Sequence, residues 1–107
     1  MHFERISVLE ARDLIARLEN AERPKKAKIV DVRDERSFAA EHIKDASHLD
    51  NASLQDFIDN SEFDLPVLVY CYHGHMSMNV ASYLGSLGFT NVYSLDGGFE
   101  AWKAIKS

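Results

Sequence analysis

The amino-acid sequence predicts an α/β fold, in which a parallel sheet is covered by helices on both faces. Segments with the pattern of strands alternate with segments with the pattern of helices, and this alternation favours parallel strands joined by helical crossovers. Residues 66–71 are apolar and rich in β-branched side chains, which is typical of a buried strand rather than a helix. The chain has 107 residues and no internal repeat or linker, so we expect a single domain over residues 1–107.

The first third of the chain predicts two strands separated by a helix. Residues 3–6 have a short strand pattern, and Ser7 with Glu10 forms the capping-box pattern that begins a helix. That helix presents an apolar face and is expected to end near Asn20. A polar loop with a proline follows, and residues 27–33 form the second predicted strand.

Shorter elements surround the strand at residues 66–71. Ser53 is expected to cap a helix that begins after it, and Gly88 is expected to end the helix that follows Ser77. Asp96-Gly97-Gly98 is a strong turn signal. The other predicted elements are a helix over residues 34–40, a turn and short strand within 43–49, a strand over 90–95 and a helix over 99–105.

Composition and charge exclude several classes of function. The formal net charge is −5 and the pI is near 5.4, so nucleic acid is not expected as a partner. No apolar run is long enough to cross a membrane and the N-terminus lacks a signal-peptide pattern, so we expect a cytoplasmic protein without a membrane partner. A single cysteine excludes an internal disulfide and a cysteine-based zinc cluster.

That cysteine, Cys71, is predicted at the C-terminal end of a strand and directly before a short loop centred on Gly74. Backbone N–H groups of such a loop can converge on one point, together with the unpaired N–H groups and the positive dipole end of the following helix. A sulfur at that point is stabilised as a thiolate, which is a strong nucleophile. The alternative is that Cys71 is a small buried hydrophobic residue.

The other candidate site residues lie in this loop or beside it. His73 and His75 are expected to rim the pocket, where a protonated imidazole would help an anion to approach. We expect no metal, because the spacing provides no fourth ligand, and no cofactor. Arg33 ends a strand that should neighbour the Cys71 strand, and it is a candidate source of positive charge at the mouth. The alternative for Arg33 is an ion pair with a neighbouring acidic residue: Asp31, Asp34 or Glu35. The candidate substrate cradle and rim comprise Tyr72, His73, Gly74, His75, Met76 and Ser77.

Three separated motifs resemble those of the rhodanese family. Residues 29–33 together with Phe38 and His42-Ile43 resemble its entry motif, residues 71–76 resemble its catalytic loop, and residues 96–102 resemble its closing motif. The motifs occur in the family's order and at its spacing, and together they cover nearly the whole chain. The Cys-Tyr-His-Gly loop and the Asp-Gly-Gly-Phe-Glu-Ala-Trp end are most similar to the single-domain GlpE-type thiosulfate sulfurtransferases.

The resemblance implies a five-stranded parallel sheet with helices on both faces and a two-step transfer of sulfur. The thiolate of Cys71 would attack the outer sulfur of thiosulfate and expel sulfite. The resulting persulfide would be held by the N–H groups of the loop. A thiophilic acceptor would then remove the sulfur: cyanide in vitro, or a thiol protein such as a thioredoxin-like protein in the cell.

The sequence departs from the family pattern at four positions. Met76 ends the loop where Arg, Thr or Ser is common, and Met78 stands in place of the lysine of the GlpE type. The loop therefore lacks side chains that would help to hold an anion, although its backbone N–H groups are retained. Glu41 and Asp45 stand where glycines are common in the family.

Two other functions remain as alternatives at the level of the sequence. A phosphatase or arsenate reductase of the related Cys-loop kind needs an arginine at the end of the loop to clamp a tetrahedral dianion, whereas this loop ends with Met76-Ser77. A non-catalytic rhodanese-like binding or sulfur-carrier module is the other alternative, although such modules often lack the cysteine that is present here.

Overall fold

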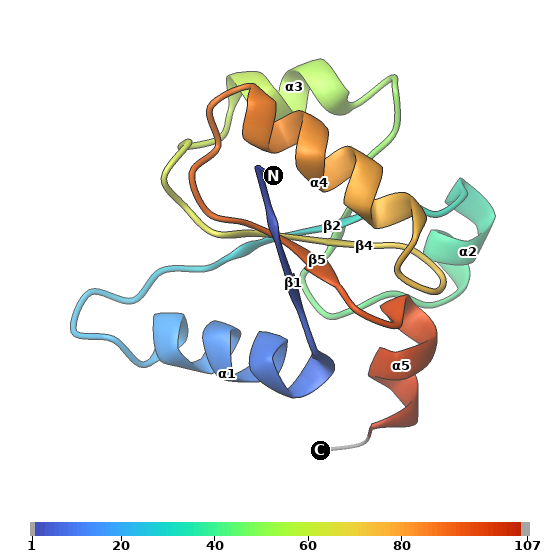
Figure 1. The fold of residues 1–107 in the computed structure, drawn as a ribbon, viewed down its shortest axis with the longest axis horizontal. Coiled ribbons are helices and arrows are strands. Elements are labelled where there is room, and N and C mark those ends of the chain that lie inside the picture. Colours follow the sequence, from blue (N-terminus) through green and yellow to red (C-terminus); the bar gives the residue numbers. More distant parts are fainter. Residues whose placement is uncertain (1, 106–107) are drawn as a thin grey trace.

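The computed structural model describes residues 2–105, which contain a five-stranded sheet in the order β1-β5-β4-β2-β3 (Figure 1). Each pair of neighbouring strands is parallel. The strands are β1 (Glu4–Ile6), β2 (Lys28–Asp31), β3 (Ser47–His48), β4 (Val67–Tyr70) and β5 (Val92–Leu95). The predicted parallel α/β fold is therefore confirmed.

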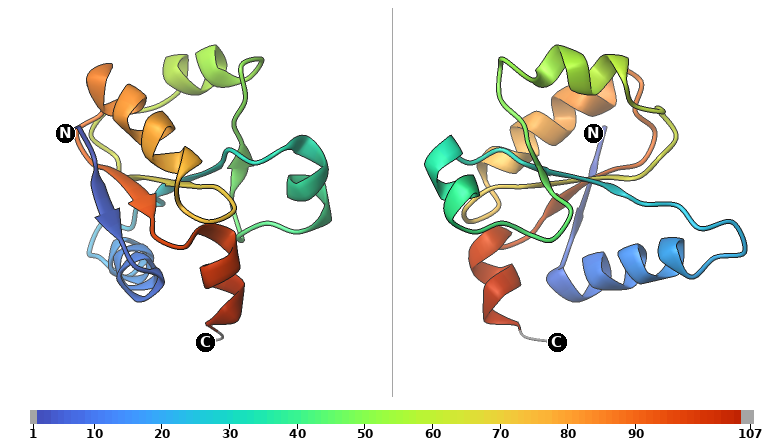
Figure 2. Two further views of the ribbon diagram at one scale, coloured as in Figure 1. Left: turned by 45° about the vertical axis from the view of Figure 1, so that its right-hand side comes forward. Right: turned by 180° about the vertical axis from the view of Figure 1, so that it is seen from behind.

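Helices cover both faces of the sheet, as the sequence predicts. They are α1 (Val8–Glu19), α2 (Glu35–Ala40), α3 (Leu54–Asp59), α4 (Met76–Ser86) and α5 (Gly98–Ala104). In all views α3 and α4 lie on one side of the sheet and α1 and α5 on the other, while α2 lies near the loop that joins β4 to α4 (Figures 1 and 2). Within residues 2–105, no helix has the length and apolar character needed to cross a membrane.

The central strand β4 divides the hydrophobic core into two clusters, because its successive side chains point to opposite faces. Val67 and Val69 pack with Leu84 of α4 in one cluster. Leu68 and Tyr70 belong to the other cluster, which includes residues of α1 and α5. All four β4 side chains are fully buried, so this strand is a rigid base for the loop that follows it.

The helix ends agree only in part with the sequence prediction. The capping box is confirmed, since Glu10 N–H donates to Ser7 Oγ at 3.1 Å and Ser7 N–H donates to Glu10 Oε1 at 2.9 Å. Gly88 follows the last residues of α4 with φ +116°, as expected of a residue that ends a helix. The capping role of Ser53 is wrong: it precedes α3, but its hydroxyl donates to the His48 carbonyl instead.

Two further differences concern backbone conformation. α4 begins at Met76, so Ser77 lies within its first turn rather than before it. Asp45 has φ +70°, a conformation that glycine adopts with less strain.

Candidate active site

Cys71 directly follows β4, at the carboxyl edge of the sheet. Its side chain is only 2% exposed. The adjacent strand β2 extends alongside, because Val32 N–H donates to the Tyr70 carbonyl at 3.0 Å. The sulfur is therefore held at the centre of the sheet edge where ligands bind in open parallel sheets.

The sulfur accepts hydrogen bonds from two backbone N–H groups of the following loop. Gly74 N lies 3.2 Å from Cys71 Sγ, and Ser77 N lies 3.3 Å from it. The Ser77 N–H belongs to the first turn of α4, and the residue before that helix, His75, makes no side-chain cap. Cys71 Sγ thus occupies the place of a capping oxygen, which explains why α4 starts without a polar capping side chain.

A chain of two buried hydroxyl groups also reaches the sulfur. Ser77 Oγ lies 3.5 Å from Cys71 Sγ, and Ser94 Oγ on β5 lies 2.8 Å from Ser77 Oγ. Ser77 is 0% exposed and Ser94 is 1% exposed, so water does not compete for these contacts. When the sulfur is ionised, the Ser77 hydroxyl can donate to it. The sequence alone does not predict a role for Ser94 at this site, because its place beside Ser77 depends on the pairing of β5 with β4.

These contacts lower the pKa of the Cys71 thiol. Burial alone raises this pKa, because a thiolate is costly in an apolar environment. The Ser77 side chain and the N–H groups of Ser77, Gly74 and His73 lower it, and together they outweigh the effect of burial. Their combined effect is the thiolate stabilisation that the sequence analysis expected for this loop.

The first residues of α5 form hydrogen bonds with the backbone of the Cys71 loop. Phe99 N–H donates to the Cys71 carbonyl at 2.8 Å, and Glu100 N–H donates to the Tyr72 carbonyl at 3.2 Å. A Cβ atom at Gly98 would lie 2.5 Å from the Tyr72 carbonyl oxygen, so this contact requires glycine. The turn signal at residues 96–98 was evident in the sequence, but its contact with the Cys71 loop was not.

Gly74 packs against the same turn. Its φ is +99°, and an added Cβ would lie 2.9 Å from Gly97 N and 3.2 Å from the Leu95 carbonyl oxygen. A residue without a side chain is therefore needed at the centre of the loop. This geometry keeps the loop tight enough for its N–H groups to face the sulfur.

Arg33 forms an ion pair with a neighbouring acidic residue, which is one of the two roles that the sequence left open for it. Its Nη2 lies 2.8 Å from Asp31 Oδ2, and both side chains are buried. The same nitrogen donates to the Glu41 carbonyl at 2.6 Å. Burial acts to lower the pKa of Arg33, but the hydrogen bond and the charge of Asp31 raise it by more, so the guanidinium stays protonated. Since the predicted alternative, an ion pair with a neighbouring acid, is present, Arg33 stabilises the end of β2.

The remaining loop residues lie at the rim. The Tyr72 hydroxyl contacts Ser37 Oγ at 3.1 Å and also bonds to the Asp34 carboxylate, so it ties the loop to α2. His73 and His75 are exposed, which is compatible with a place at the rim. Met76 is 49% exposed, so its apolar side chain lies partly in solvent.

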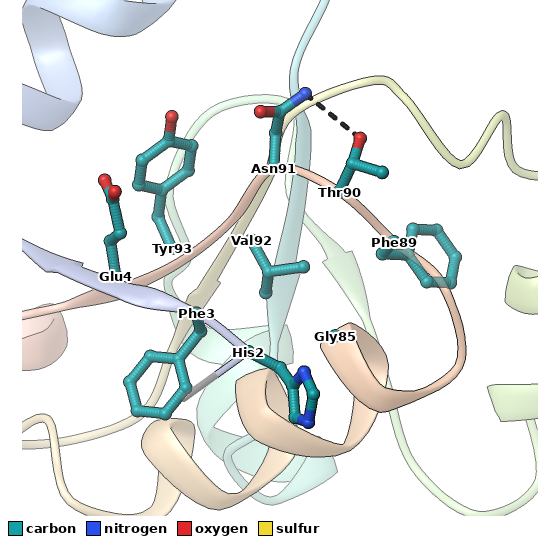
Figure 3. A pocket seen from close by; sticks show the side chains of 9 residues that line it. All are labelled: His2, Phe3, Glu4, Gly85, Phe89, Thr90, Asn91, Val92 and Tyr93. Atoms are coloured by element: carbon teal, nitrogen blue, oxygen red, sulfur yellow. Dashed lines mark hydrogen bonds between the residues drawn. The ribbon is translucent and has the colours of Figure 1, made fainter.

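A separate cavity lies at the opposite edge of the sheet (Figure 3). Its volume is about 300 Å³, and it lies among the amino ends of β1 and β5. The side chains of Phe3, Glu4 and Tyr93 lie on one side of it, and His2 lies beside Gly85 of α4. Because the Cys71 loop leaves the carboxyl end of β4, this cavity is not part of the candidate active site.

Comparison with known proteins agrees with the geometry of the site. The sequence profile of the rhodanese-like domain family matches residues 10–105. The thiosulfate sulfurtransferase GlpE of Ectopseudomonas mendocina is 49% identical over 102 residues, which cover 95% of this chain and 86% of that protein. The thiosulfate sulfurtransferase GlpE of Pseudomonas putida is 56% identical over 78 residues, which cover 73% of this chain and 71% of that protein.

A solved structure shows the same fold. The solution NMR structure of a rhodanese-like domain from Anabaena superposes with a TM-score of 0.77 at 29% identity, covering 96% of this chain and 75% of that one. From its sheet order, its cysteine loop and these similarities, we conclude that the chain belongs to the rhodanese-like domain family.

Proposed function

We propose that this protein is a thiosulfate sulfurtransferase that carries a sulfane sulfur as a persulfide on Cys71. The observation that carries the proposal is the environment of the sulfur. The sulfur is buried, and it accepts hydrogen bonds from the N–H groups of Gly74 and Ser77. The pKa of the thiol is lowered there, so a larger share of it is nucleophilic at neutral pH. In this proposal residues 1–107 act as one rhodanese domain.

The first step is attack by the Cys71 thiolate on the outer sulfur of thiosulfate. The bond between the two sulfur atoms of thiosulfate breaks, and sulfite leaves with the electron pair. The enzyme retains a persulfide whose outer sulfur carries the negative charge. In this proposal the N–H groups of the loop, which surround Cys71 Sγ in the structure, stabilise that charge as preorganised donors do in other anion-stabilising sites.

The second step returns the cysteine to its starting state. A thiophilic acceptor attacks the outer sulfur, and Cys71 leaves as a thiolate. Cyanide would serve as the acceptor in vitro and yield thiocyanate, and a thioredoxin-like thiol protein is the acceptor we propose in the cell. We propose a cytoplasmic location, because the lone thiol is functional only where it stays reduced.

The two alternative functions are less compatible with this geometry. A Cys-loop phosphatase needs a free guanidinium to hold a dianion, but the loop ends with Met76 and Ser77, and Arg33 is bound to Asp31. A non-catalytic module needs no nucleophile, yet Cys71 is held by donors that favour its ionised form. These contacts favour an enzyme over a binding module.

Mass spectrometry of the intact protein tests the proposal. Incubation with thiosulfate should add the mass of one sulfur atom, and subsequent cyanide should remove it and release thiocyanate. Cys71→Ser should show no added mass. If the sulfur is still added to Cys71→Ser, Cys71 is not the carrier and the mechanism is wrong.

A further inference from the structure

The hydroxyl group of Ser94 lies on the face of the sheet that α4 covers. Ser94 of β5 pairs with Val69 of β4, so the two side chains point to the same face. Val69 packs there with Val92 and Leu84 in an apolar cluster. Ser94 is itself fully buried. A hydroxyl in such surroundings is costly unless its hydrogen has an acceptor, so the direction of its hydrogen bond matters.

Ser94 is joined to the reactive sulfur through one other side chain. In the part of the chain that the structure describes, the hydrogen-bond partner of Ser94 Oγ is Ser77 Oγ, 2.8 Å away. Ser77 Oγ lies 3.5 Å from Cys71 Sγ. Each hydroxyl has one hydrogen and can also accept. The two contacts can therefore run toward the sulfur, from Ser94 to Ser77 to Cys71, or away from it.

The number of hydrogens decides this direction when the sulfur is a thiolate. If both bonds run toward the sulfur, each hydroxyl hydrogen has an acceptor and the thiolate gains a donor. If Ser77 donates to Ser94 instead, the Ser94 hydrogen is buried without a partner and the thiolate loses this donor. Both losses are expensive away from water, so the bonds run toward Cys71.

The same direction is favoured when the sulfur carries its proton. The two arrangements then contain the same kinds of bond and differ in which hydrogen is left over. Bonds toward Cys71 leave the S–H group, which is a weak donor, whereas bonds away from it leave the Ser94 hydroxyl, which is a strong one. The Ser77 hydrogen therefore points to the sulfur both before and after ionisation, and no reorientation accompanies the change of charge.

We propose that Ser94 is a positioning residue, which donates to Ser77 Oγ and thereby commits the single hydrogen of the Ser77 hydroxyl to the sulfur of Cys71. Its importance for turnover rests on the proposed function, in which Cys71 is a thiolate when it attacks the donor and again when it leaves the persulfide. Burial raises the pKa of the Cys71 thiol, and the Ser77 side chain has the largest effect among the groups that lower it. A residue that directs this side chain should therefore act on the same pKa.

Ionisable side chains also surround the Cys71 loop, but within residues 2–105 none of them is a hydrogen-bond partner of the two hydroxyl groups. Most are bound to other groups, and the two histidines of the loop are exposed. The bound ones are Arg33 with Asp31, Asp96 with Arg5, Lys103 with Glu100, Tyr72 with Asp34, and Tyr70 with the Ile43 N–H; the histidines are His73 and His75. Uncharged substitutions at Ser94 leave all of these groups in place.

The rate of alkylation by iodoacetamide against pH tests the inference, because Cys71 is the only thiol of the chain. Ser94→Ala should raise the midpoint by about half a pH unit, since Ser77 is then free to turn away from the sulfur. In a Ser77→Ala background the same substitution should have no further effect, because Ser94 acts through Ser77 alone.

A second pair of variants controls for packing. Thr and Val have the same shape, so Ser94→Thr and Ser94→Val add the same bulk to the apolar cluster and differ in the hydroxyl group. The midpoint of Ser94→Val should lie about half a pH unit above that of Ser94→Thr. Crowding, or a loss of stability from the added methyl group, affects both variants and does not produce this difference.

Each other result overturns the role of Ser94. A lower midpoint in Ser94→Ala would mean that Ser77 donates to Ser94 and that Ser94 competes with the sulfur. An unchanged midpoint, an equal rise in both backgrounds, or equal midpoints in the Thr and Val variants would show that the hydroxyl does not act through Ser77. The assay contains no sulfur donor, so it is independent of the proposed function. If the midpoints behave as expected but thiosulfate adds no sulfur to the wild type, the proposed function is wrong and the positioning role stands.

Discussion

Replacing Gly98 by alanine should separate α5 from the Cys71 loop. An added Cβ at this position would lie 2.5 Å from the carbonyl carbon and oxygen of Tyr72 and 2.6 Å from the carbonyl oxygen of Cys71. Restoring an ordinary contact of about 3.5 Å requires the loop and the helix to move apart by about 1 Å. All of these atoms belong to the backbone, so rotation of a side chain cannot relieve the contact.

The cost in stability follows from the contacts that this movement breaks. Alanine at the observed φ of +60° costs about 1–2 kcal/mol relative to glycine. The hydrogen bonds from Phe99 N–H to Cys71 and from Glu100 N–H to Tyr72 contribute about 1 kcal/mol each. We therefore expect Gly98→Ala to lower the free energy of unfolding by about 3–4 kcal/mol.

The cost in activity should be larger than in a variant that is destabilised elsewhere. A displacement of about 1 Å at a catalytic group can reduce the rate on the order of a hundredfold. Gly88→Ala is the matched control, because Gly88 also has a positive φ, +116°, but its Cβ would meet only the Phe63 ring at 3.2 Å. It lies at the opposite end of α4 from Cys71.

Urea unfolding and the cyanide-coupled assay measure the two effects separately. Both variants should be destabilised, with Gly88→Ala losing about 1–3 kcal/mol, but only Gly98→Ala should lose most of its kcat/KM per folded molecule. If Gly98→Ala retains wild-type turnover while its stability falls, α5 supports the fold and not the reactive sulfur.

Two more predictions concern the buried polar groups. Ser77→Ala removes the side-chain hydrogen bond that lowers the pKa of Cys71. The midpoint of alkylation rate against pH should therefore move upward from its wild-type position, which is itself expected below the free-thiol value of about 8.5. An unchanged midpoint would mean that backbone N–H groups alone lower this pKa. Arg33→Met leaves the Asp31 carboxylate buried without its partner, which should cost about 3–5 kcal/mol in urea unfolding, and the additional change Asp31→Leu should restore much of it. A loss below about 1 kcal/mol in the single variant would contradict the importance of this ion pair.

Much of the fold was predictable because its elements depend on local patterns. A few neighbouring residues are enough to predict three of its features: the apolar strand β4, the capping box at Ser7 and the glycine after α4. Ser53 shows the limit of such patterns. Its hydroxyl could cap α3 or bond to the turn before it, and the nearby His48 carbonyl accepts it instead.

The position of Cys71 was predictable for the same reason, but the shape of its surroundings was not. The sequence places a cysteine between a strand and a helix, and a lone motif cannot tell where that helix begins. The start at Met76 depends on the sulfur, which accepts the Ser77 N–H in place of a capping side chain. The contacts that Ser94 and Gly98 make join segments that are distant in the chain, so they follow from sheet order and not from spacing in the sequence.

The contact between α5 and the Cys71 loop has a consequence for how the protein is made. The chain is synthesised from its N-terminus, so Cys71 and Tyr72 are made before Phe99 and Glu100, whose N–H groups donate to their carbonyl groups. Until those residues are available, the carbonyl groups of Cys71 and Tyr72 lack these two donors. We therefore expect the Cys71 loop to reach its final geometry only after α5 has been synthesised and has docked.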